Sequence, residues 1–275
     1  NVSILMSKPH RLYIFTGKGG VGKTTLAKAF TRYLTSQNFN AVYLTFGTSA
    51  LGTENSSNQM ETVDGIKELS LDLEKSAQGY IEKKLNSAMI ASWIMKTPFF
   101  RALVNMIPGF NYLIYLGQTL ELAERDSSLI FVLDSPASGH AVTMMEATSN
   151  FGEIFGTGLV FEDTKKMLAR LNNPDYAKVV IASLPSLMSW QESMELKNSL
   201  KERSPIDCDI ILNNALTPIF KTDDDIPVNL REKVKFESQL LADQGDLIKA
   251  VIPHSMQQDN LDIQRDLLGS LSTLL

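Results

Sequence analysis

The sequence predicts an α/β protein with a mostly parallel, doubly wound sheet that carries helices on both faces. Three observations lead to this fold class. Short apolar runs recur along the chain, helix-compatible stretches lie between them, and the composition is that of a globular protein. Of the 275 residues, 44% are hydrophobic and 21% are charged, which is ordinary for a chain that buries a sizeable core.

The six apolar runs are the predicted strands. Each is rich in β-branched or aromatic residues and lacks alternation, which is typical of strands buried on both faces in a parallel sheet. In chain order they cover residues 12–15, 41–46, 129–133, 178–183, 209–213 and 249–252. Parallel neighbours require crossover connections, and the helix-compatible stretches between the runs supply them.

The interval between the second and third predicted strands is too long for a single crossover. It holds two long helix-compatible stretches, and a further one follows Gly139. We expect one domain over residues 1–275, with a helical subdomain inserted on one side of the sheet. That subdomain is predicted to comprise about 65–128 and 141–172.

The stretch from Thr16 to Thr25, TGKGGVGKTT, fits two phosphate-binding patterns. The dinucleotide pattern G-x-G-x-x-G also requires an acidic residue near the end of the second strand, and YLTFGTS contains none. The P-loop pattern requires Lys and Ser or Thr directly after its last glycine, and Lys23 and Thr24 stand there. A predicted strand precedes the loop and helical spacing follows it. The sequence therefore predicts a P-loop NTPase fold.

Each position of this loop has a chemical reason. Glycines let successive backbone N–H groups form an anion nest, and the helix that follows adds its positive end. Lys23 would reach the β- and γ-phosphates, and the Thr24 hydroxyl would ligate Mg²⁺. The predicted nucleotide contacts in the loop are Gly17, Lys18, Gly19, Gly20, Val21, Gly22, Lys23, Thr24 and Thr25.

A second candidate site segment follows the third predicted strand. Asp134 stands at the strand end, where a Walker B-type carboxylate would hold the Mg²⁺ shell. The predicted metal ligands are thus Thr24 and Asp134, and Lys23 and Asp134 are predicted to be catalytic.

Lys18 gives the loop the form G-K-G-G-x-G-K-[ST], which resembles the deviant Walker A class of nucleoside triphosphatases. That class includes ParA, MinD, nitrogenase iron protein and the ArsA/Get ATPases. The segment DSPASGH, residues 134–140, resembles the D-T-A-P-T-G-H switch II segment of the ArsA/Get group. This resemblance makes Gly139 the candidate γ-phosphate sensor, because a glycine lets the backbone approach a ligand closely. The resemblance spans most of the chain, to about residue 260. It implies ATP or ADP with Mg²⁺ as cofactors and a homodimer in which Lys18 is a further catalytic residue that reaches the partner's nucleotide, much as an arginine finger does.

Weaker matches to the same group lie further along the chain. IILNN resembles a segment whose Asn reads the adenine, which places Asn213 in that role; a plain strand-end turn residue is the alternative. AVIPHS resembles the adenine loop, with Pro253 at the matching place. Glu192 lies on a predicted helix that matches a Glu-bearing helix of the group.

The sequence departs from the group after the second strand. The group has D-P-A-H there, and its Asp positions the attacking water, whereas this chain has Phe46 or Gly47 at that place. Glu54 and Asp64 are distant candidates for the missing acid. The leading hypothesis is an ATPase, with slow hydrolysis expected. The alternatives are a nucleotide-gated binding module with little or no hydrolysis, and a ParA/MinD-like positioning ATPase.

Composition excludes several function classes. The single cysteine, Cys208, cannot form an internal disulfide, a Cys-x-x-Cys zinc site or an arsenite-binding cluster. The net charge of −5 argues against a general nucleic-acid binder. No apolar run approaches the roughly 18 residues that span a bilayer, and the C-terminal segment has a single Arg265, so stable membrane insertion is not expected. The start lacks a secretory h-region, and Met6 is a candidate natural start. We expect a cytoplasmic protein.

The predicted helical segments are rich in large apolar side chains. Met-rich surfaces suit the binding of a partner helix, and in Get-type proteins the matching region holds a client's transmembrane helix. Packing of the helices against one another is the alternative, and periodicity does not separate the two. The residues concerned are Met89, Ile90, Trp93, Ile94, Met95, Phe99, Phe100, Met144, Met145, Phe151, Phe155 and Phe161.

Overall fold

The computed structural model describes residues 8–47, 58–107, 109–136, 142–148, 159–220 and 226–275. Several residues singled out in the sequence lie outside these ranges: Met6, Glu54, Gly139, His140, Phe151 and Phe155. The side chain of Phe99 is also outside the described part.

All six predicted strands are present in one sheet. They are β1 (Leu12–Thr16), β2 (Asn40–Phe46), β5 (Leu129–Asp134), β6 (Ala177–Ser183), β7 (Asp207–Ala215) and β8 (Ile248–Pro253). The sheet has eight strands in the order β3-β4-β2-β5-β1-β6-β7-β8, and every pair except β3–β4 is parallel. The predicted α/β class with a mostly parallel sheet is confirmed.

The sheet also contains an edge hairpin that was not predicted, formed by β3 (Met60–Val63) and β4 (Ile66–Leu71). Its turn is Asp64–Gly65, with φ angles of 49° and 81°. An Asp-Gly pair between two runs of strand-forming residues is a strong hairpin signal. It was overlooked because β3 is exposed throughout and β4 carries charged residues, so neither is a continuous apolar run. Residues 66–71, which we had placed in the helical subdomain, therefore belong to the sheet.

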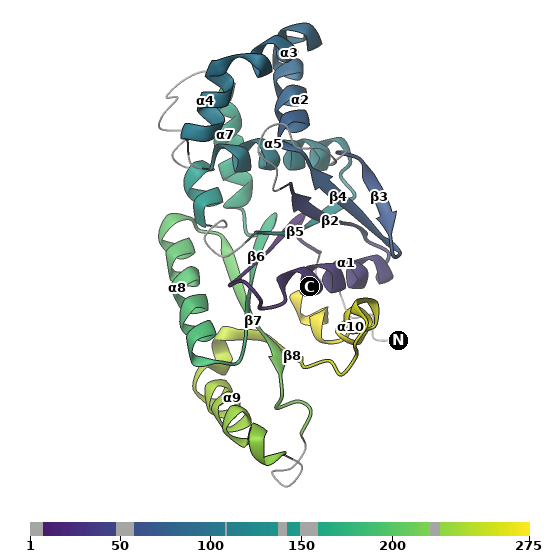
Figure 1. Ribbon diagram of the computed structural model, residues 1–275, viewed down its shortest axis with the longest axis vertical. Coiled ribbons are helices and arrows are strands. Elements are labelled where there is room, and N and C mark those ends of the chain that lie inside the picture. Colours follow the sequence, from purple (N-terminus) through teal and green to yellow (C-terminus); the bar gives the residue numbers. More distant parts are fainter. Residues whose placement is uncertain (1–7, 48–57, 108, 137–141, 149–158, 221–225) are drawn as a thin grey trace.

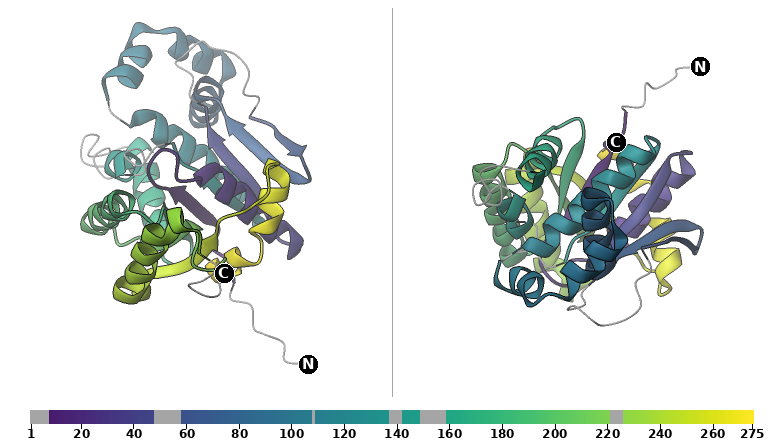
Figure 2. Two further views of the ribbon diagram at one scale, coloured as in Figure 1. Left: turned by 60° about the horizontal axis from the view of Figure 1, so that its bottom comes forward. Right: turned by 90° about the horizontal axis from the view of Figure 1, so that it is seen from above.

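Helices cover both faces of the sheet (Figure 1). Tyr13 and Phe15 of β1 pack on the face of α1 (Lys23–Ser36), whereas Leu12 and Ile14 pack on the opposite face. The first face also holds α10 (Asn260–Asp266), which lies beside α1 (Figure 2). The second holds α5 (Phe110–Arg125), α8 (Leu187–Arg203) and α9 (Arg231–Gln244). Because successive side chains of a strand point to opposite faces, each central strand supplies both cores.

Further helices lie beyond one end of the sheet, at the top of Figure 1. They are α2 (Leu73–Leu85), α3 (Ala88–Lys96) and α4 (Pro98–Met106), with α7 (Leu159–Leu171) beside α5. Side chains cap two of them: Asp72 accepts from the Lys75 N–H at 2.9 Å, and Ser87 from the Ile90 N–H at 3.3 Å. In the described part of the chain, no helix combines the length and apolarity that crossing a bilayer requires.

The strand order fixes where a site can form. β1 lies between β5 and β6, and the chain leaves β1 directly into the glycine-rich loop and α1. Because the carboxyl ends of parallel strands meet at one edge, Thr16, Asp134, Ser183 and Ala215 end their strands near this loop. Ligands of open α/β sheets bind in the crevice at such a switch point.

Candidate functional site

The glycine-rich loop lies closely against the ends of β6 and β7. Gly17, Gly20 and Gly22 have φ angles of 142°, 84° and 90°, a region that side chains disfavour. A Cβ atom on Gly17 would lie 2.4 Å from the Ala182 carbonyl oxygen, and one on Gly22 would lie 2.5 Å from Asn213 Nδ2. The loop conformation therefore requires glycine at both positions.

Lys23 begins α1 and points back into the loop. Its Nζ donates to the Lys18 carbonyl oxygen at 2.9 Å. Burial lowers the pKa of Lys23, and the nearby charge of Asp134 opposes that shift. The Lys23 ammonium thus contacts the backbone of a loop whose amide N–H groups are suited to binding an anion.

Thr24 and Asp134 meet beside this ammonium. Thr24 Oγ1 donates to Asp134 Oδ2 at 2.6 Å, which joins the start of α1 to the end of β5. The same Oδ2 accepts from the hydroxyl of Tyr43 on β2 at 2.9 Å. Burial, together with the Asp134 carboxylate, raises the pKa of the Tyr43 phenol. No signal in the sequence marks Tyr43, because its contact with Asp134 depends on β2 lying next to β5.

The residues present fit a magnesium ion. The Thr24 hydroxyl and the Asp134 carboxylate are hard oxygen donors that already lie within hydrogen-bond distance. Mg²⁺ is commonly held by one or two protein oxygens together with substrate phosphates, so two such side chains at the head of a P-loop suffice.

Lys18, at the exposed tip of the loop, pairs with Glu192 of its own chain. The distance from Nζ to Glu192 Oε1 is 2.6 Å, and the two side chains are 47% and 40% exposed. Glu192 lies on α8, one turn after its exposed start. The sequence indicated both residues separately but carried no signal that they meet.

A cavity of about 270 Å³ opens on the other side of the loop. Two predicted adenine contacts, Asn213 and Pro253, lie on its wall together with loop residues. Asn213 also supports the loop, because its Nδ2 donates to the Val21 carbonyl oxygen at 2.8 Å. The lining comprises Gly20, Val21, Gly22, Thr25, Leu184, Asn213, Asn214, Pro253, His254, Ser255, Gln257, Ile263 and Leu267.

The end of β2 is held by contacts with helix α5 rather than with the glycine-rich loop. Phe46 is 6% exposed and its ring stacks on Tyr115 of α5, with centroids 4.6 Å apart. The Tyr115 hydroxyl donates to the Gly47 carbonyl oxygen at 3.0 Å. Asp64 lies in the β3–β4 turn, before the amino end of β4 and so at the edge of the sheet away from the loop. The structure therefore rules out Asp64 as a water-positioning acid.

The apolar side chains of the helical segments divide into three groups by exposure. Met95, Phe100, Met144 and Met145 are buried, so they pack within the protein. Ile94 and Phe161 are half-buried. Three neighbours on α3 remain in solvent, with exposed fractions of 83% for Met89, 47% for Ile90 and 68% for Trp93.

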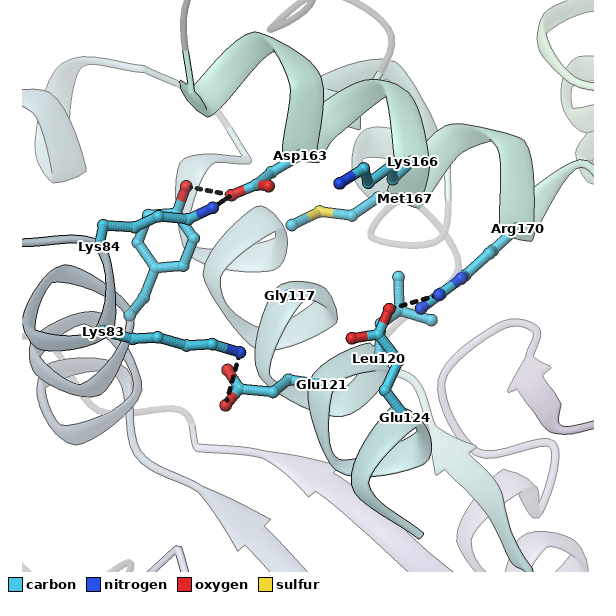
Figure 3. A pocket seen from close by; sticks show the side chains of 11 residues that line it. Lys83, Lys84, Gly117, Leu120, Glu121, Glu124, Asp163, Lys166, Met167 and Arg170 are labelled. Atoms are coloured by element: carbon cyan, nitrogen blue, oxygen red, sulfur yellow. Dashed lines mark hydrogen bonds and ion pairs between the residues drawn. The ribbon is translucent and has the colours of Figure 1, made fainter. Parts of the chain in front are cut away.

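A second, smaller cavity of about 100 Å³ lies among α2, α5 and α7 (Figure 3). Polar contacts that cross between these helices surround it. Asp163 of α7 accepts from the hydroxyl of Tyr80 at 2.7 Å and pairs with Lys84 at 2.6 Å. Lys83 pairs with Glu121 at 3.2 Å, and Arg170 pairs with Glu124. These contacts tie α2 and α7 to α5.

Cys208 is buried in β7 at 5% exposure. Burial, reinforced by the charge of Asp207, raises the pKa of its thiol to about 12. Because the thiolate is the reactive and metal-binding form, this cysteine is a structural residue.

Comparison with known proteins agrees with this geometry. Residues 10–160, more than half of the chain, match the anion-transporting ATPase family. The chain is 23% identical over 266 residues to ATPase asna-1 of Caenorhabditis elegans, with 78% of each chain covered. A shorter similarity, 32% identity over 76 residues, covers 28% of this chain and 39% of an adenylate kinase of Methanococcus aeolicus. The chain therefore belongs to the anion-transporting ATPase family, and at that level it is a nucleotide-binding, ATP-hydrolysing enzyme.

Proposed function

We propose that this chain is a Mg²⁺-dependent ATPase that works as a homodimer and couples its nucleotide state to a partner bound at its helical segments. The observation that carries the proposal is the contact between Thr24 Oγ1 and Asp134 Oδ2. It brings two predicted metal ligands together at the head of a loop that also borders the cavity containing Asn213 and Pro253. The residues proposed to hold the phosphates, the metal and the base are thus neighbours, which supports the proposal.

Each group has a role in this proposal. The loop amides and Lys23 would hold the phosphates. Thr24 and Asp134 would hold a magnesium ion, which would supply positive charge to the phosphate oxygens. Asn213 and Pro253 bound the adenine. Gly139, which lies outside the described residues, remains the proposed γ-phosphate sensor.

The proposed dimer involves the face that carries Lys18. Next to it, α8 begins with Leu187 and Met188, which are 57% and 67% exposed. On association, Lys18 would exchange Glu192 for the phosphates bound by the other copy. Breaking the pair with Glu192 would cost little free energy, because an ion pair between half-exposed side chains contributes only about 0–1 kcal/mol.

The purified protein tests this function. We expect ATP hydrolysis with Mg²⁺ and none in EDTA, a shift from monomer to dimer in sedimentation velocity when Mg²⁺ and ATP are added, and tighter binding of ATP than of GTP. The Asn213→Ala variant should reduce the preference for ATP. The absence of ATP binding in the presence of Mg²⁺ would refute the proposal.

A second candidate is a nucleotide-gated binding module that hydrolyses ATP very slowly. One observation favours it: Phe46 is turned toward α5, and Gly47 has no side chain to orient water. Single-turnover hydrolysis separates the two candidates. Tight Mg²⁺-dependent ATP binding without measurable product over hours would select the binding module.

For the partner, we propose that α2–α5, with α7 and residues 142–148, form a helical subdomain that presents an apolar surface. This surface consists of Leu85, Met89, Ile90 and Trp93, which are all exposed by 44% or more. Flexible methionine beside an aromatic ring suits an apolar helix of varied sequence. We therefore propose an apolar helical segment of a partner protein as the occupant.

The fluorescence of Trp93 can show whether this surface is occupied. Only two tryptophans are present, and Trp190 is 8% exposed, so a Trp190→Phe variant leaves Trp93 as the sole emitter. We expect its fluorescence to shift to shorter wavelength when an apolar helical peptide of about 20 residues is added with ATP. A Met89→Ser change should weaken the peptide's binding several-fold. Val228→Ser, a matched change at an exposed apolar residue in the Val228–Leu230 turn, should not.

A further inference from the structure

Tyr43 occupies a position where a buried strand normally needs only an apolar side chain. It lies in the middle of β2, at 4% exposure, among the apolar residues that face α1. A buried tyrosine hydroxyl requires a hydrogen-bond partner, and here the partner is Asp134 Oδ2 at 2.9 Å. The strand order makes this contact, because β2 pairs with β5 and sets Thr45 opposite Asp134.

We propose that Tyr43 is a positioning residue for the Asp134 carboxylate and thereby sets the affinity of the site for Mg²⁺. The proposal rests on the proposed function, in which Asp134 and Thr24 hold the metal. Tyr43 would touch neither the nucleotide nor the metal and would act only through Asp134.

The hydrogen bonds of Asp134 support this role. Its Oδ2 accepts from Tyr43 on one side and from Thr24 on the other, at 2.9 and 2.6 Å. Oδ1 accepts no hydrogen bond from another described residue. With one oxygen fixed by two hydroxyls, the carboxylate cannot rotate freely about its terminal torsion. A threonine hydroxyl has one proton and two lone pairs, so Thr24 can keep its bond to Asp134 while a lone pair faces the cation.

The ring of Tyr43 is itself held in place. Lys28 Nζ lies 4.8 Å from the ring centroid, an arrangement that stabilises a cation over an aromatic face. Lys28 also pairs with Glu68 of β4 at 2.7 Å, and both side chains are only about a quarter exposed. Lys28 of α1, itself paired with Glu68 of β4, therefore holds the Tyr43 ring independently of Asp134. A residue that orients a metal ligand through a hydrogen bond is expected to be held in this way.

The test is the Tyr43→Phe variant, which removes one oxygen and keeps the ring. Binding of a fluorescent ATP analogue is measured against MgCl₂ concentration and again in EDTA. We expect the Mg²⁺ concentration at half-maximal effect to rise about tenfold, with the affinity in EDTA unchanged. Tyr13→Phe is the matched control, since Tyr13 is a buried sheet tyrosine whose hydroxyl contacts His10 instead. It should leave both values unchanged.

Asp134→Asn separates failure of this inference from failure of the proposed function. If Tyr43→Phe matches the unchanged protein while Asp134→Asn weakens the Mg²⁺ effect, Tyr43 has no positioning role and the proposed metal site stands. If Asp134→Asn also has no effect, the metal role of Asp134 is wrong and the positioning role falls with it. An equal change in Tyr13→Phe would show general loosening of the sheet and overturn the inference. Thermal unfolding of each variant checks that it is folded.

Discussion

Replacing Lys23 with alanine is expected to lower the affinity for ATP by about 100-fold or more and to abolish hydrolysis. The ammonium lies within the loop, on the Lys18 carbonyl oxygen, where the β- and γ-phosphates would be held. A hydrogen bond to a charged group contributes about 1.5–3 kcal/mol, and every 1.4 kcal/mol is tenfold in affinity. Losing two such bonds therefore accounts for about two to four orders of magnitude. Equilibrium titration with a fluorescent ATP analogue measures the loss.

Lys18→Ala is the matched control in the same loop. Its side chain is at the exposed tip and pairs with Glu192 rather than with the loop backbone. We expect ATP affinity within about threefold of the unchanged protein, because exposed ion pairs contribute little, and a loss of turnover only under conditions in which dimers form. If both variants lost ATP binding equally, the two lysines would have the same role, and the proposed action of Lys18 across the dimer would be wrong.

Replacing Gly17 with alanine is expected to lower the free energy of unfolding by about 3 kcal/mol and to prevent nucleotide binding. The φ angle of 142° is strained for a residue with a side chain, which costs about 1–3 kcal/mol. In addition, the new Cβ would overlap the backbone oxygen of Ala182 at 2.4 Å. Because this oxygen belongs to the central strand β6 and not to a flexible side chain, relief requires the loop to move away from the sheet.

Gly19→Ala provides the comparison. Apart from its two neighbours in the chain, no described residue has an atom within 4 Å of the position its Cβ would take, so the change should stay within about 0.5 kcal/mol, as for exposed positions generally. Thermal unfolding and ATP titration of the two variants form the test. We expect the midpoint for Gly17→Ala to fall by roughly 5–10 °C. Equal midpoints would mean that the loop does not need glycine at position 17.

The continuous apolar runs predicted the centre of the fold well. Each became a strand within two residues of its predicted bounds, because strands covered on both faces have no polar side to interrupt the run. The edge hairpin was missed for the opposite reason. β3 faces solvent throughout, and β4 carries Lys67 and Glu68, so only the Asp64–Gly65 turn marked them.

The site was predictable where its residues are consecutive. Lys23 and Thr24 follow from the loop motif alone, and the geometry brings Thr24 to Asp134 as that motif requires. Contacts between distant segments were not predictable. The bond from Tyr43 to Asp134 depends on which strands become neighbours, and the pairing of Lys18 with Glu192 joins residues 174 positions apart. Tyr43 and Glu192 are ordinary residue types at their positions, so the sequence alone does not mark these two contacts.

The stacking of Phe46 on Tyr115 has a mechanical consequence. An acidic side chain at the end of β2 would respond to the charge of a nearby phosphate, whereas an aromatic ring responds only to displacement. Since Tyr115 both stacks on Phe46 and holds the Gly47 carbonyl oxygen, a shift of this strand end would press directly on α5. The first residue of α5 lies about 8 Å along the axis from Tyr115, on the side where α4 joins it. The contacts from Phe46 through Tyr115 and α5 would thus transmit a steric signal from the end of β2 to the helices.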